Sequence, residues 1–211
     1  MAISFVAARH GTNVTTAEPT GTAEGDIVLA LYTTETTSAA PTPATGFSLV
    51  GSFDTNVAAS GVQNFGVYWA RRGGSAIATD WSSGVSGEVV SLITYRGCID
   101  TGNPVEASNY GEEADNSMVN TGVTTLSPNA MIVGFSSGWT WGAHTSTMAN
   151  ERVDAGETQG IYDNGIQAAV GATGSFTFTV GNVIGTMVLA LSPPPLVDLI
   201  SKNMYLKQGF Q

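Results

Sequence analysis

The chain has few charged residues, and basic residues are especially scarce. Of its 211 residues only 7 are lysine or arginine, and charged residues of all kinds make up 11%. Long amphipathic helices usually carry many more charges on the face that meets water, so this composition argues against a helical protein. With 17 acidic residues the formal net charge is −10, and such a surface repels the phosphates of nucleic acids. Nucleic acid is therefore not an expected partner.

Cysteine and histidine are scarce as well. Cys98 is the only cysteine, so no internal disulfide can form. A chain of this length buries enough surface to fold without a disulfide or a structural metal. The two histidines, His10 and His144, lie far apart in the sequence. They form no recognisable zinc-binding set with the single cysteine, and we expect neither a metal nor a cofactor.

The sequence also lacks long apolar runs. A bilayer-spanning helix needs about 20 consecutive apolar residues, whereas the longest run here is Val183–Leu191. The segment Met1–Ala8 lacks the basic stretch and long apolar run of a secretory signal. We therefore expect a protein that is made and kept in the cytoplasm, with no membrane partner.

Short alternating or apolar segments, bounded by Gly, Pro, Asn or Asp, recur along the chain, as is typical of strands joined by turns. Phe176, Phe178 and Val180 alternate with polar residues, which indicates one buried and one wet face. Ile27–Leu31 and Val183–Leu191 are apolar nearly throughout, so we expect covered central strands there. The predicted strands are Ile3–Ala8, Asp26–Thr33, Phe47–Phe53, Val62–Arg71, Glu88–Tyr95, Met131–Ser136, Gly160–Gln167, Ser175–Val180 and Val183–Leu191.

An internal similarity relates the two halves of the chain. Val14–Thr16 precedes the strand Asp26–Thr33, and Val123–Thr125 holds the same place before a strand of the second half. Trp81 and Phe178 each lead through a Gly-bearing turn into the next apolar strand. Strand-rich sequences can also look alike by chance. Because two Greek keys build a jelly roll, the predicted fold is an all-β, jelly-roll-like antiparallel β-sandwich.

The character of the sequence changes after residue 192, where we place the end of the sandwich domain. Pro193–Pro195 cannot continue a sheet and predicts a stiff spacer. Residues 196–211 contain the only lysines of the chain. We expect 193–211 to be a spacer and a docking arm, either a short helix or extended, that inserts apolar side chains against a neighbouring subunit or a particle surface. The alternatives are that it folds back on its own sandwich or is disordered. The inserted side chains would be Leu196, Leu199, Ile200, Met204, Tyr205 and Phe210.

Five strand and turn stretches within residues 1–192 carry a family resemblance: Gly25–Ala30, Thr45–Phe47, Val67–Ala70, Thr94–Gly97 and Asn103–Val105. In this order they resemble a loose group of β-sandwich proteins from tailed-phage structural modules, which includes capsid decoration (cement) proteins and tail or fibre components. The resemblance implies a virion protein made in the host cytoplasm. It further implies that the protein binds the major capsid protein or other virion proteins, and that it forms a homo-oligomer, for which a trimer is common in the group.

One motif matches an enzyme pattern. Gly134–Gly138 reads G-x-S-x-G, the nucleophile elbow of α/β-hydrolases, with Ser136 at the nucleophile position. An elbow needs a strand, a strained turn and a following helix, and no helical period follows here. We therefore predict that the protein is not an enzyme, and that replacing Ser136 leaves its biological activity intact.

Two tryptophans predict a second function. In a strand Trp139 and Trp141 project to the same face and form a platform that can stack on sugar rings. A carbohydrate-binding adhesin or tail-fibre component that contacts host glycans is therefore the alternative function. Packing at the end of the sandwich, or at a subunit interface, is the other interpretation of this pair.

Two arginines close a predicted strand. Arg71 and Arg72 are either a solvated hairpin tip or a contact for an acidic neighbour, which makes them candidate interface residues. The nearby Trp69 and Trp81 lie in or beside core-like strands, and we expect both in the core.

Overall fold

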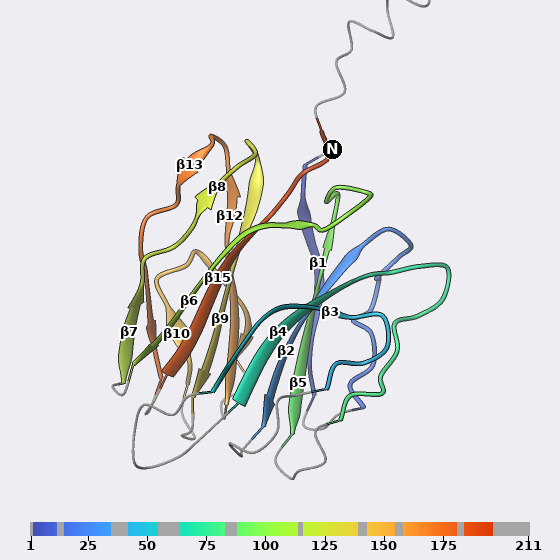
Figure 1. The fold of residues 1–211 in the computed structure, drawn as a ribbon, viewed down its shortest axis with the longest axis horizontal. Coiled ribbons are helices and arrows are strands. Elements are labelled where there is room, and N and C mark those ends of the chain that lie inside the picture. Colours follow the sequence, from blue (N-terminus) through green and yellow to red (C-terminus); the bar gives the residue numbers. More distant parts are fainter. Residues whose placement is uncertain are drawn as a thin grey trace, which may run out of the picture.

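The structure is a computed structural model, and it describes residues 2–11, 15–34, 42–54, 64–82, 88–113, 116–138, 143–154, 158–180 and 184–195. Within these ranges it is an antiparallel β-sandwich without helices (Figure 1), which confirms the predicted fold class. All nine predicted strands are present, with ends that differ by no more than a few residues.

The first half of the chain forms one five-stranded sheet. Its strands, in spatial order, are β1 (Ser4–Gly11), β5 (Val89–Arg96), β2 (Ile27–Thr34), β4 (Asn64–Arg71) and β3 (Ser48–Asp54). The apolar strand β2 is central and buried along its whole length, as its sequence predicts.

The second half forms another five-stranded sheet, which packs against the first (Figure 1). Its strands, in spatial order, are β11 (Asn150–Asp154), β12 (Gln159–Gln167), β9 (Ala130–Gly138), β15 (Ile184–Leu191) and β6 (Val105–Glu113). The second predicted central strand, β15, lies between β9 and β6.

The two sheets have the same connectivity. If the five strands of each five-stranded sheet are numbered in chain order, they lie across the first sheet in the order 1-5-2-4-3. The strands of the second sheet, numbered in the same way, lie in the same order. β1 thus corresponds to β6, β2 to β9, β3 to β11, β4 to β12 and β5 to β15. The similarity between the halves of the sequence therefore reflects a repeated architecture, in which each half forms its own five-stranded sheet.

Three apolar clusters hold these layers together. The largest lies between the two sheets and includes Leu29, Val133 and Leu189. A second lies between the second sheet and a small outer sheet made of β10 (Thr145–Ser146), β14 (Phe176–Thr179) and β7 (Ser117–Asn120). The third covers the outer face of the first sheet and contains Trp81, which is 3% exposed and confirms the core prediction for this residue. A two-stranded sheet of β13 (Gly171–Ala172) and β8 (Thr124–Thr125) stands at one end of the molecule (Figure 1).

Candidate interaction surfaces

One side of the sandwich, where β1 meets β11, is closed by an aromatic ring and a guanidinium group. The guanidinium carbon of Arg152 lies 4.1 Å from the ring centroid of Phe5. Arg152 Nε donates to Asp163 Oδ2 at 2.6 Å, and this buried carboxylate also accepts hydrogen bonds from Tyr95 and Asn150. Burial and the adjacent Asp163 raise the pKa of Tyr95 well above its usual value. These contacts tie the two sheets together along this side.

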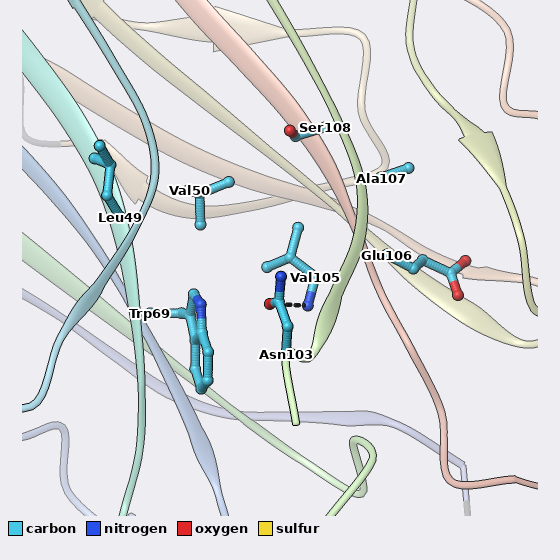
Figure 2. A pocket seen from close by; sticks show the side chains of 8 residues that line it. All are labelled: Leu49, Val50, Trp69, Asn103, Val105, Glu106, Ala107 and Ser108. Atoms are coloured by element: carbon cyan, nitrogen blue, oxygen red, sulfur yellow. Dashed lines mark hydrogen bonds between the residues drawn. The ribbon is translucent and has the colours of Figure 1, made fainter. Parts of the chain in front are cut away.

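The opposite side, where β3 faces β6, contains a groove of about 260 Å³ (Figure 2). Trp69 on β4 lines it and also packs against the central core, so its predicted core position is correct only in part. Leu49 on the edge strand β3 is 54% exposed. The backbone N–H of Val105 donates to Asn103 Oδ1 at 3.0 Å and fixes the start of β6. The lining residues are Leu49, Val50, Trp69, Asn103, Val105, Glu106, Ala107 and Ser108.

The repeat explains why this side is open. β3 and β11 each contain a β-bulge, and matching the bulges makes Val50 the counterpart of Arg152. β1 and β6 also each contain a bulge, which makes Val105 the counterpart of Phe5. Two valines therefore occupy the positions that hold the guanidinium and the aromatic ring on the closed side, and these smaller side chains leave the groove unfilled.

The chain leaves the sandwich beside this groove. Ser192 Oγ donates to Oε2 of the groove residue Glu106 at 2.9 Å, and Ser192 N donates to the carbonyl of Pro104 at 2.8 Å. Ile99 N in turn donates to the carbonyl of Ser192 at 2.9 Å. By Pro195 the chain is exposed to solvent. The start of the proline spacer is thus anchored next to the lining of the groove.

An exposed apolar tip, defined by Leu126 and Val170, lies at the β8–β13 end of the molecule. Gly171 pairs with Thr125, and Leu126 and Val170 are the residues just beyond this pair. Leu126 is 68% exposed and Val170 is 56% exposed. The backbone N–H of Leu126 donates to Glu106 Oε1 at 2.9 Å, which holds the tip in a fixed place on the body. Nothing in the sequence pattern distinguishes these two residues from ordinary turn residues.

The arginine pair is bound to its own chain. Arg71 Nη1 donates to the carbonyl of Ile99 at 2.7 Å. Arg72 Nε lies 3.4 Å from Glu18 Oε2, and the side chains of both partners are mostly buried. The acidic neighbour of Arg72 is therefore a residue of the same molecule, and both arginines tie the end of β4 to adjacent segments.

The other predicted binding residues lie outside the described part of the chain. They are Trp139, Trp141, Leu196, Leu199, Ile200, Met204, Tyr205 and Phe210.

The serine of the G-x-S-x-G match has a histidine partner that sequence reasoning missed. Ser136 Oγ lies 2.9 Å from His144 Nδ1, and both side chains are fully buried. Burial lowers the pKa of His144 to about 4, although the nearby Asp154 acts in the opposite direction. Ser136 belongs to β9, which is paired on both sides by antiparallel neighbours. It therefore lacks the strand-to-helix turn that exposes the serine of a nucleophile elbow.

No family model, curated protein or solved structure matches the chain. The ranges described above contain no helix that is long and apolar enough to cross a membrane. Over the same ranges, no cluster of three or more His, Cys, Asp or Glu side chains is arranged so that it could hold a metal ion. The repeat, the groove and the tip are the features from which we infer function.

Proposed function

We propose that the protein is a structural component of a tailed-phage virion, most specifically a decoration protein that binds the assembled capsid shell. The observation that carries the proposal is the exposed apolar tip. Apolar surface left in water costs about 25 cal/mol per Å², and Leu126 and Val170 both expose theirs just beyond the pairing of β8 with β13. Contact with a shell protein would remove this surface from water.

The virion setting is supported by the five stretches that resemble phage structural proteins. Several of them contact one another or the chain end in the fold. Arg96 Nη2 lies 2.7 Å from Asp26 Oδ2, which joins the first stretch to the fourth. Pro104, in the fifth stretch, accepts the backbone hydrogen bond of Ser192. The stretches thus form part of the framework that positions both the groove and the start of the spacer.

Co-sedimentation with capsid shells prepared without the protein tests the proposal. The wild-type protein should pellet with the shells, and a Leu126→Ser, Val170→Ser double variant should bind at least about tenfold more weakly, equivalent to about 1.4 kcal/mol. Val119→Ser is the matched control, because Val119 is 58% exposed but lies on β7, outside the tip. This control should bind like the wild type. Failure of the wild-type protein to pellet, or equal binding by the tip variant, would contradict the proposal.

A further inference from the structure

We infer that the groove between β3 and β6 receives the C-terminal segment Leu196–Gln211 of a second copy of the chain. Copies joined in this way form a closed ring, in which each one donates a segment and accepts another. The inference rests on the proposed function, because it names the self-association through which a decoration protein contacts several shell sites at once.

The lining of the groove combines apolar side chains (Val50, Trp69 and Val105) with polar ones (Asn103, Glu106 and Ser108). An occupant that carries both kinds of side chain therefore fits it. Val50 and Val105 stand where the closed side of the sandwich holds Arg152 and Phe5, and Trp69 adds an aromatic wall (Figure 2). The missing volume is therefore that of large side chains that would lie between the sheets. Apolar cavities of roughly 150 Å³ take up a benzene ring, so a groove of about 260 Å³ has room for one or two aromatic or branched side chains.

The C-terminal segment supplies such side chains. Tyr205 and Phe210 are aromatic, and Leu199 and Ile200 are branched. A segment this short cannot bury them within itself, so another surface has to cover them. Its lysines, Lys202 and Lys207, are the only ones in an otherwise acidic chain, so the segment is attracted to the body of another copy.

The way the chain leaves the sandwich favours a second copy over the segment's own groove. Pro193–Pro195 follows the anchored Ser192 and extends the chain by about 9 Å as a stiff polyproline stretch. Pro195 is exposed, and no glycine occurs after it until Gly209. The first apolar residues of the segment thus follow a spacer that ends at an exposed proline, without a glycine that would favour a reversal of the chain. In each copy the groove lies beside the start of the spacer. A segment that enters the groove of the next copy therefore brings that copy's own segment close as well, and repeating this contact from copy to copy closes a ring.

A complementation experiment with full-length chains tests this inference. The acceptor-dead variant carries Leu49→Glu and Ser108→Arg, two exposed groove positions at which a charge blocks the apolar side chains of the occupant. The donor-dead variant carries Leu199→Asp, Ile200→Asp and Phe210→Asp in the C-terminal segment. Light scattering at micromolar concentration should show an oligomer for the wild type and a monomer for each variant alone. An equimolar mixture of the two should give a complex of one chain of each.

Several results would overturn the inference: a monomeric wild type, an oligomer formed by either variant alone, or a mixture that stays monomeric. Ser108→Arg alone provides a second acceptor variant, and thermal melting verifies that each variant is folded. Val119→Glu, an exposed change outside the groove, should leave the wild-type oligomer intact. Shell co-sedimentation separates the two proposals. Shell binding without complementation refutes the groove exchange alone, whereas complementation without any shell binding refutes the decoration function alone.

Discussion

His144 is a single buried residue that makes the stability of the fold depend on pH. Its ring is fully buried, its Nδ1 is 2.9 Å from Ser136 Oγ, and its Nε2 has no hydrogen-bond partner among the residues that the structure describes. A proton on this ring would place a charge inside the protein that Asp154 offsets only in part, which is why burial lowers the pKa of His144 to about 4. The folded state therefore holds this histidine neutral at pH values at which the unfolded chain protonates it.

We expect His144 to destabilise the fold as the pH falls from about 6.5 to about 4. In this window the unfolded chain binds a proton that the folded protein excludes, so up to about 3 kcal/mol of stability is lost, and the loss levels off below pH 4. Urea unfolding at pH 7.0 and pH 4.5, compared between wild type and His144→Asn, isolates this effect from other titrating groups. The variant should lose less stability between the two pH values. Equal losses would show that His144 is protonated in the folded state.

At the scale of the strand, the two halves repeat a close contact between a glycine and a tyrosine. On β4 a Cβ at Gly66 would lie 2.5 Å from Tyr68 Cε2, and on the corresponding β12 a Cβ at Gly160 would lie 2.5 Å from the hydroxyl of Tyr162. Each tyrosine ring thus lies over the glycine two residues before it. Burial raises the pKa of Tyr68 to about 12 and shifts the pKa of Tyr162 in the same direction. The absence of a Cβ on these strands is what allows the rings to pack.

Gly66→Ala should therefore destabilise the protein by about 1–3 kcal/mol, the usual cost of forcing extra atoms into a packed interior. Gly73→Ala is the matched control, because a Cβ there meets nothing within 4 Å. Chemical unfolding followed by circular dichroism measures both. Indistinguishable midpoints for the two variants would show that Tyr68 moves aside freely and that the contact is not a constraint.

Sequence patterns predicted the central strands and missed the edge strands of the second sheet. β2 and β15 read as strands because both faces are covered and their residues are apolar. β6 reads VEASNYGEE and β11 reads NERVD. As edge strands they are only partly buried, so polar residues break the alternation on which the prediction depends. Their pairing with neighbours from distant parts of the chain fixes them as strands.

The groove and the apolar tip could not be predicted from the sequence, because both depend on strand register and strand pairing. The groove exists because Val50 and Val105 occupy positions equivalent to Arg152 and Phe5, which becomes visible only once strand register and bulges are known. The placement of Leu126 and Val170 at one end of the molecule likewise follows from the pairing of β8 with β13. The sequence leaves Arg71 and Arg72 open between a solvated hairpin tip and a contact with an acidic neighbour, because their partners Ile99 and Glu18 are brought near only by the fold.

At the scale of the whole molecule, a repeated five-stranded unit produces two sides that are not alike. The β1–β11 side is closed by Phe5, Arg152 and Asp163, whereas the β3–β6 side is left open beside the start of the C-terminal spacer. The apolar tip is linked to the groove through Glu106, whose two carboxylate oxygens accept from Ser192 and from the backbone of Leu126. The carboxylate of Glu106, which lines the groove, thus holds both the proposed shell contact and the point at which the chain leaves the body.

Electron cryomicroscopy of purified phage particles that carry the gene for this chain is the most direct test of the proposed virion function. We expect density that fits the two-sheet body of residues 2–195, repeated over the capsid shell, with the Leu126 and Val170 tip directed at the shell protein. Particles from which the protein is absent, as judged by both the density and mass spectrometry of the same preparation, would contradict the proposed function.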